Sequence, residues 1–374
     1  MKKSTKIILA VLIIIAIIIG TMFLIDLNRM KHNKPVIFST WGRKYVPPAK
    51  VNTKLSIVTS LEDEITSNTA WCGTFNLIWN DLKKDLAKQD IVFTPQPKMV
   101  DNLNKGTFNT SCLSEDSYYK VYGSPTIELK KQIEKAIKEK FNETSDILDD
   151  FSWEEGESDN YFLYVMLKKQ FEFPKVFTKL ENGDFGKYKN VKYFGIDSST
   201  DEAVRNQVEV LYYNSSSDFA IKLKTKQNDE VIISRGNTET NFGDVFKSIT
   251  EKSSKYNGST TFNETDKLKI PNIKFNLKEE ITEVENKLFT FSNGREYCIE
   301  KALQTIEFEL DEKGGKIKSE AGISLKEAAI KPTEKPRDFR VDDTFTIFLK
   351  EEGRDLPYFA AQIADISQVQ EDVK

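Results

Sequence analysis

The residue types that usually perform catalysis or bind metal ions are scarce in this chain. Its 374 residues include one histidine, His32, and three cysteines, Cys72, Cys112 and Cys298. A Ser-His-Asp or Cys-His site needs a histidine base, and His32 lies in the expected linker, outside the folded domain. A zinc site of the common Cys/His type lacks ligands as well. We therefore predict that the chain is not an enzyme and uses no metal and no cofactor.

The three cysteines allow two interpretations. Outside the cell, one disulfide could form and would leave one thiol over, and the sequence alone does not pair them. Three buried thiols that pack as small apolar side chains are the other interpretation.

Carboxylates are plentiful, with 58 Asp and Glu residues, but their spacing selects no site. The acidic stretch 146–160 lacks the ligand spacing of a calcium loop, and we interpret it as a solvated connection. No pair of carboxylates stands out as the acid and base of a hydrolase, which makes an extracellular hydrolase the weakest hypothesis. The net charge of −4 and the lack of an obvious basic face argue against nucleic acid as a partner.

One segment near the N-terminus has the length and composition of a membrane-spanning helix. Residues Ile7–Ile25 contain no charge, and as a helix they would extend roughly 28 Å, close to the hydrocarbon core of a bilayer. Lys2, Lys3 and Lys6 precede the segment and favour keeping the N-terminus inside. A cleaved signal peptide would have a shorter apolar region and a small-residue cleavage site, so we predict an uncleaved anchor.

The anchor divides the chain into three expected parts. We predict a transmembrane signal-anchor over residues 1–30, a proline-bearing linker over 31–50 and one large domain over 51–374. Apolar residues make up 39% of the chain, which is enough for a sizeable core. The predicted location is the cell membrane, crossed once, with the C-terminal domain outside the cell.

Hydrophobic spacing predicts helices early in the domain and strands later. Helical patterns cover 67–86, with capping side chains at 67–69, and then 124–141, 245–251 and 278–287. Strand patterns cover 161–167, 190–196, 207–213, 219–226, 230–234, 267–277, 302–311, 345–349 and 358–366. This order predicts an α+β domain in which helices pack on large mixed or antiparallel sheets.

The last third of the chain resembles the serpin family in an ordered series of segments. KLKIPNIKFNLKEEI is similar to the serpin strand that meets a proline, and EYCIEKALQTIEFELDEKGGK is similar to the strand that leads into the reactive loop. DFRVDDTFTIFL and LPYFAAQIADI resemble the strands after the loop, with Phe345 at the family's signature phenylalanine. Upstream, NTAWCGTF and YFLYVMLKKQFEFP are weaker matches, in which Cys72, Leu163 and Phe171 replace the usual residues. The resemblance covers residues 51–367 and implies a divergent, membrane-anchored, bacterial-type serpin with an exposed reactive loop near its C-terminus.

The resemblance implies a mechanism that needs no catalytic residue in the inhibitor. A protease cuts the exposed loop and forms an acyl-enzyme, and the loop then inserts into the main sheet and carries the protease along. The implied hinge residues are Glu312, Gly314, Gly315, Ile317, Ser319 and Ala321. Small or apolar side chains alternate with charged or solvent-tolerant ones along 315–325, as an inserting strand requires, although a plain edge strand would show the same alternation. The bulky Ile317 departs from the usual alanine-rich hinge and would slow insertion.

Two counts place the scissile bond differently. Counting from Gly314 places it at Ala328–Ala329, which suits an elastase- or subtilisin-like protease. Counting back from Phe345 places it near Lys331, which suits a trypsin-like protease, but a proline follows Lys331 and resists cleavage. We therefore favour Ala328.

The sequence thus predicts a surface-tethered serpin-type inhibitor of serine or cysteine proteases. Its expected partners are the target protease and, through Ile7–Ile25, the membrane, and we expect a monomer. The alternative is a non-inhibitory serpin-fold surface protein that serves as a binding or structural module. The replacements at Cys72, Leu163 and Phe171 motivate this alternative.

Overall fold

The computed structural model describes residues 55–156, 159–315, 336–371 and 373. The chain divides into two units, Met1–Thr53 and Lys54–Lys374, and the description concerns the second. Within the described ranges, no helix is long and apolar enough to cross a membrane. The expected anchor, Ile7–Ile25, and the expected linker lie outside these ranges, so both stay predictions.

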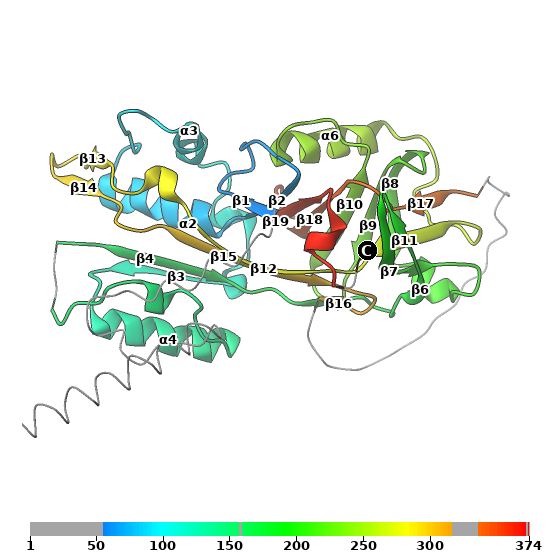
Figure 1. The fold of residues 1–374 in the computed structure, drawn as a ribbon, viewed down its shortest axis with the longest axis horizontal. Coiled ribbons are helices and arrows are strands. Elements are labelled where there is room, and N and C mark those ends of the chain that lie inside the picture. Colours follow the sequence, from blue (N-terminus) through cyan, green and yellow to red (C-terminus); the bar gives the residue numbers. More distant parts are fainter. Residues whose placement is uncertain (1–54, 157–158, 316–335, 372, 374) are drawn as a thin grey trace, which may run out of the picture. The chain divides into compact units, whose positions relative to one another are not determined.

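A seven-stranded mixed sheet is the largest element of the structure (Figure 1). Its strands, in spatial order, are β1 (Leu55–Val58), β2 (Asn68–Cys72), β19 (Phe359–Ile363), β18 (Phe345–Glu351), β10 (Asp229–Arg235), β9 (Asp218–Lys224) and β8 (Val208–Ser215). β1 runs parallel to β2, and every other neighbouring pair is antiparallel. Side chains on both faces of its central strands are buried, which explains why these strands read as nearly continuous apolar runs.

A four-stranded sheet contains the strand that follows residues 316–335. Its strands, in order, are β17 (Asp338–Arg340), β11 (Lys267–Pro271), β7 (Tyr188–Ile196) and β6 (Thr178–Phe185). β17 is parallel to β11, and the other two pairs are antiparallel. This sheet is therefore also mixed.

The remaining strands form antiparallel pairs. They are β3 (Tyr118–Gly123) with β4 (Phe162–Leu167), β12 (Ile273–Glu280) with β15 (Leu303–Leu310), β13 (Leu288–Thr290) with β14 (Glu296–Cys298), and β5 (Phe171–Glu172) with β16 (Gly314–Gly315). β5 follows β4 closely along the chain, and β16 follows β15, so the short β5–β16 pair joins the ends of two longer ones.

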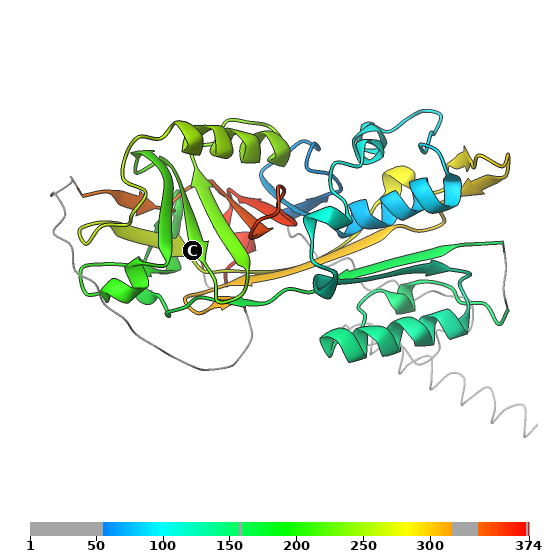
Figure 2. The ribbon, with the colours of Figure 1, turned by 180° about the vertical axis from the view of Figure 1, so that it is seen from behind.

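The helices cover these strands. They are α2 (Thr74–Asp81), continued by the π-helical turn η1 (Leu82–Ala87), α3 (Lys98–Lys105), α4 (Ile127–Phe141), α5 (Glu202–Arg205) and α6 (Phe242–Lys255). Short 3-10 turns are η2 (Thr110–Cys112), η3 (Glu115–Ser117), η4 (Leu148–Asp150), η5 (Thr282–Val284) and η6 (Ile366–Gln368). α6 lies over the seven-stranded sheet, where Phe242 and Phe246 contact Phe348 of β18. α4 lies along the β3–β4 pair, and Ile133 and Ile137 share a buried cluster with Phe162 (Figure 2).

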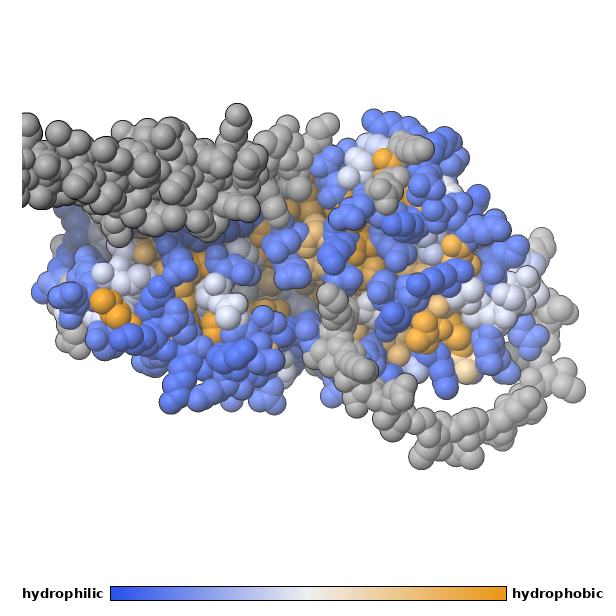
Figure 3. Space-filling model, turned by 60° about the horizontal axis from the view of Figure 1, so that its bottom comes forward, coloured by the Kyte–Doolittle hydropathy of each residue, from blue (hydrophilic) through white to orange (hydrophobic). Residues whose placement is uncertain are grey.

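Three hydrophobic clusters hold these layers together. The largest fills the space around the two larger sheets, the second lies between α2, α3 and the β13–β14 pair, and the third lies under α4. The face in Figure 3 is mostly hydrophilic, with apolar side chains visible in small groups. The core is therefore extensive, and burial of apolar surface is the main stabilising term.

The predicted α+β class, with helices on mixed and antiparallel sheets, is confirmed, and two helix predictions are wrong in part. The helix expected from 67 begins only at Thr74, because Asn68–Cys72 forms β2 and pairs with β19. The Asn68 side chain does not cap a helix; its Nδ2 donates to Asp365 O over 2.7 Å. The helix expected at 278–287 is wrong, since β12 continues to Glu280 in register with β15.

The cysteines are free thiols, and no disulfide joins them. Cys72 and Cys112 are buried, and Cys298 is exposed on β14. Burial raises the pKa of the Cys72 thiol, and hydrogen bonds from Thr74 only partly offset this. Cys72 is therefore a structural thiol rather than a nucleophile.

Candidate functional site

The chain reverses direction at the predicted hinge. β15 ends at Leu310, and a tight turn over 311–314 leads into β16. The turn is closed by the Gly314 N–H, which donates to Asp311 O over 3.3 Å, and by the Lys313 N–H, which donates to Asp311 Oδ1 over 2.8 Å. Gly314 has a φ of +124°, and a Cβ at this position would lie 2.4 Å from Phe171 O. The turn therefore requires glycine at 314.

Two backbone hydrogen bonds fasten the turn to the segment after β5. The Phe173 N–H donates to Lys313 O over 2.9 Å, and the Phe177 N–H donates to Glu312 O over 2.8 Å. β16 itself pairs with β5 over two residues only. The hinge is thus held by a two-residue ladder and two backbone hydrogen bonds from the segment after β5.

Glu312 is the one buried carboxylate of the hinge turn. It is 4% exposed, and its side chain forms an ion pair of 3.2 Å with Lys179 of β6. The Lys179 side chain is 75% exposed, so solvent screens the pair and it stabilises the hinge only weakly.

The two strands that lead to the hinge each have one edge without a ladder. Among the strands that the structure describes, β4 pairs only with β3, and β15 pairs only with β12. Among the described residues, no ladder joins β4 to β15. The two strand pairs are connected by a ladder only where β5, which follows β4, pairs with β16, which follows β15. Backbone groups on such edges can accept a further strand.

α2 lies against both of these strands. Leu163 of β4 packs in the cluster that contains Phe75 of α2. From β15, Gln304 Nε2 donates to Cys72 O and to Thr74 Oγ1, each over 3.0 Å, at the start of α2. Gln304 Oε1 is buried and has no hydrogen-bond partner within the described ranges. α2 and the residues at its start therefore contact both β4 and β15.

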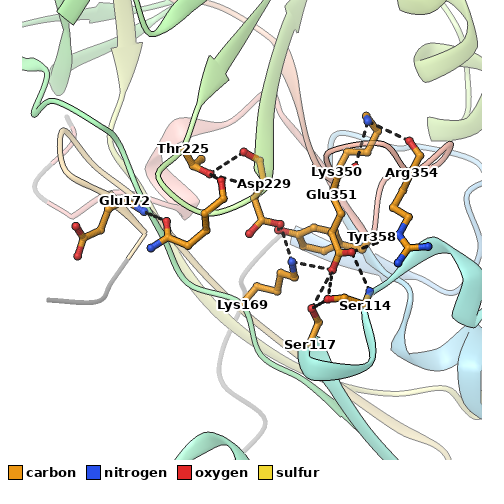
Figure 4. A network of polar contacts seen from close by, with 11 residues as sticks. Ser114, Ser117, Lys169, Glu172, Thr225, Asp229, Lys350, Glu351, Arg354 and Tyr358 are labelled. Carbon is orange, nitrogen blue, oxygen red and sulfur yellow. Dashed lines mark hydrogen bonds and ion pairs between the residues drawn. The ribbon is translucent and has the colours of Figure 1, made fainter. Parts of the chain in front are cut away.

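A buried charge network lies beside β5 (Figure 4). The Lys169 ammonium, in the link between β4 and β5, is 2.8 Å from both Asp229 Oδ1 and Glu351 Oε1. Asp229 begins β10 and Glu351 ends β18, and the two are cross-strand partners. The side chains of Asp229, Glu351 and Lys169 are 4%, 7% and 14% exposed, so the network is almost entirely out of water.

Burial and hydrogen bonding act in opposite directions on the pKa of both carboxyl groups in this network. Burial raises the pKa of Asp229, and donation from Lys169 and Tyr358 offsets only part of this. Burial acts in the same direction on Glu351, but donation from Lys169, the Ser114 N–H and the Ser117 hydroxyl outweighs it and holds the pKa of Glu351 at about 2. Lys169 is thus the cationic partner that favours the ionised form of both carboxyl groups.

The turn between β9 and β10 lies next to Asp229, at the corner of the seven-stranded sheet where β10 begins and β18 ends, and it contacts β5. The Lys226 N–H donates to Glu172 O over 2.8 Å, and the Glu172 N–H donates to Gln227 Oε1 over 2.8 Å. The Lys226 ammonium also lies 2.7 Å from Glu172 Oε2. β5 therefore lies between the hinge strand on one side and this turn on the other (Figure 4).

The structure brings together only part of the predicted site. Glu312 lies in the turn after β15, and Gly314 and Gly315 form β16, so the three residues meet at the hinge. Ile317, Ser319, Ala321, Ala328, Ala329 and Lys331 lie outside the described residues and stay predictions. Within the described ranges, no group of three or more His, Cys, Asp or Glu side chains could hold a metal ion.

Sequence reasoning missed the network around Lys169. Its one available signal was the pair Lys168–Lys169 at the end of an apolar strand, since a lysine there needs a partner. The partners, Asp229 and Glu351, are far away in the sequence, and no local pattern connects them to Lys169.

Comparisons with known proteins give similarity at the level of solved structures only. No protein-family model matches the chain, and no curated protein sequence matches it. The chain is similar to a crystal structure of maspin, at 12% identity over 79% of this chain and 92% of that one, with a TM-score of 0.49. It is also similar to Tengpin, a thermophilic serpin in the native state, at 12% identity over 82% and 90% of the two chains, with a TM-score of 0.46.

A third similar structure is the thyroxine-binding globulin complex with thyroxine. Its identity is 11% over 80% of this chain and 93% of that one, with a TM-score of 0.43.

Proposed function

We propose that the chain is a serpin-type inhibitor of serine or cysteine proteases that acts by cleavage of a loop within residues 316–335 and insertion of residues 315–325. One observation supports this most strongly. The edges of β4 and β15 without a ladder converge on a hinge, and the hinge directly precedes this segment. A strand that entered there would bond on both sides, and each added backbone hydrogen bond would contribute about 1 kcal/mol.

The chemistry would belong to the protease. Its Ser Oγ or Cys Sγ attacks the scissile carbonyl carbon, the C–N bond breaks, and the amine leaves with a proton. The new carbonyl end stays on the protease as an ester or thioester. Residues 315–325 would then insert with their small and apolar side chains toward the core. The inhibitor supplies only a substrate bond and the stabilisation gained by insertion.

Location is part of the proposal. With Ile7–Ile25 in the membrane and residues 51–374 outside the cell, the inhibitor would act only close to the surface that carries it. It would then protect that surface against nearby proteases, as a single-pass monomeric protein.

Limited proteolysis tests the inhibitor proposal. The chain is incubated with an elastase- or subtilisin-type protease and with trypsin, and SDS-stable complexes are sought by electrophoresis. Mass spectrometry of the new ends distinguishes Ala328–Ala329 from Lys331. We expect nicked protein to melt at least about 10 °C above intact protein, because insertion adds a strand. A nicked protein that melts no higher than the intact one would exclude insertion.

The alternative is a non-inhibitory binding or structural module on the same scaffold. The fastening of the hinge by Phe173, Phe177 and β5 supports it, because slow release lets a protease complete hydrolysis. Ile317→Ala separates the two functions. Conversion of a substrate into an inhibitor would identify the hinge as the block, whereas no effect of any loop change on any protease would favour the binding role.

A further inference from the structure

The segment from Lys169 to Glu172 forms two ion pairs of opposite polarity with one corner of the seven-stranded sheet, where β10 begins and β18 ends. Lys169 pairs with Asp229, which begins β10. Three residues later, Glu172 pairs with Lys226 in the β9–β10 turn. The two ion pairs have opposite polarity, so they fix one register of the link against the corner; a shifted register would place like charges together.

The backbone of β5 is shared between this corner and the hinge. Both polar backbone groups of Glu172 are taken by the turn, through Lys226 N–H and Gln227 Oε1. The next residue, Phe173, instead donates its N–H to Lys313 O of the hinge. The segment of β5 is therefore bonded to the sheet corner through Glu172 and to the hinge through its ladder with β16 and the Phe173 N–H.

Lys169 supplies the buried positive charge at this corner. Asp229 and Glu351 are cross-strand partners and nearly fully buried, so their negative charges repel at close range. Ser114, Ser117 and Tyr358 donate hydrogen bonds to them but bring no positive charge. Arg354 reaches Glu351 only from a side chain that is 40% exposed. Lys169 is the buried cation that both carboxylates share.

We propose that Lys169 and Glu172 are positioning residues that hold β5 against the sheet corner and, through β5, set how firmly the hinge strand β16 is held. This deepens the proposed inhibitor function and rests on it for its biological meaning, since hinge release would precede insertion. The physical coupling itself exists without any protease and is measured without one.

Hydrogen exchange at the hinge tests the coupling. The full chain is compared with Lys169→Met, and amide exchange is followed by mass spectrometry in residues 171–173 and 311–315. We expect exchange there to be about tenfold faster in the variant, because local opening no longer has to break the buried ion pairs.

Lys222→Met is the matched control. Lys222 also joins two glutamates, Glu209 at 3.0 Å and Glu230 at 3.2 Å, and its side chain is 20% exposed, but it does not contact β5. We expect this variant to leave exchange at 311–315 unchanged. Equal acceleration at the hinge in both variants, or none in Lys169→Met, would overturn the proposal.

A charge exchange provides a second test that does not remove a buried group. Glu172→Lys and Lys226→Glu each break the ion pair, and the double variant restores it with reversed polarity. We expect faster hinge exchange in each single variant and recovery in the double variant, which general destabilisation would not produce. If Lys169→Met fails to fold, this cycle decides alone, and a double variant that exchanges at least as fast as the single ones contradicts the proposal.

These readouts separate the two proposals. Failure to inhibit any protease, with the exchange results as expected, would leave the coupling standing and reject the inhibitor function. Inhibition with unchanged hinge exchange in Lys169→Met would do the reverse.

Discussion

A few individual residues fix the geometry around the hinge. Gly314 occupies a backbone conformation that residues other than glycine rarely adopt. A Cβ added to Gly314 would also clash with Phe171 O. Lys169 keeps two neighbouring buried carboxylates compatible. Each of these residues performs a task that its own position along the chain does not reveal.

Gly314→Ala should destabilise the domain by about 2–4 kcal/mol, because the variant combines a positive φ with a clash against Phe171 O. Chemical denaturation measures this loss. Gly353→Ala is the control, since Gly353 has a φ of +76° and nothing within 4 Å of the added Cβ. The control should lose only about 1 kcal/mol. Equal losses in the two variants would show that the contact with Phe171 does not matter.

Glu351 should make the domain sensitive to acid. Its folded-state pKa of about 2 lies below its ordinary value of 4.5, so the folded state favours the ionised form. The resulting stabilisation is complete above the unfolded-state pKa and is lost as the pH falls from about 4.5 toward 2. Glu351→Gln should cost about 1–3 kcal/mol at pH 7 and make stability less dependent on pH in that window. Urea unfolding at several pH values measures this; an unchanged slope in the variant would contradict the assignment.

At the scale of elements, the two strands that flank residues 316–335 are held in different ways. β16 has a two-residue ladder, and the turn before it has one ion pair, between Glu312 and Lys179, that solvent screens. β17 begins beside Arg337, which is 8% exposed and donates from Nη2 to the buried Asp266 over 2.7 Å. Arg337 also donates to Ser259 O and Thr261 O. The C-terminal flank is therefore anchored more firmly than the hinge.

Arg337→Met should cost about 3–5 kcal/mol, because it leaves Asp266 buried without its cation. Arg340→Met, at the end of β17, is the control. The side chains of Arg340 and its partner Asp338 are 48% and 47% exposed, so its loss should be at most about 1 kcal/mol. Denaturation midpoints give both values, and similar midpoints for the two variants would rule out the buried anchor.

The element scale also explains the incorrect helix predictions. Residues 67–69 offer capping side chains and Trp71 starts an apolar series at helical spacing, but Asn68–Cys72 is fully buried as a strand between β1 and β19. In such a position both periodicities fit, and the pairing partner decides. Residues 278–280 likewise continue β12 because β15 runs beside them.

At the scale of the whole molecule, the chain combines a large α+β fold with an apolar N-terminal segment. The described unit has its own hydrophobic core. The segment Ile7–Ile25 would contribute location rather than fold.

We expect the full chain to stay with the membrane fraction after an alkaline carbonate wash, because nineteen uncharged residues partition strongly into lipid. A chain that starts at Lys54 should remain in the supernatant. Mass spectrometry of the full chain should detect the intact N-terminus. Loss of residues 1–25 on maturation would instead identify a cleaved signal peptide.

The sequence by itself determined the α+β class, many of the strands, α4 and α6, because local spacing records which face of an element is buried. Only the tertiary structure decided that Asn68–Cys72 is a strand, that β4 and β15 each keep one edge without a ladder in the described part of the chain, and that Lys169 meets Asp229 and Glu351. Lys169 and Asp229 are 60 residues apart in the sequence. A pairing over such a distance depends on how the sheets pack, and no local pattern of residues encodes it.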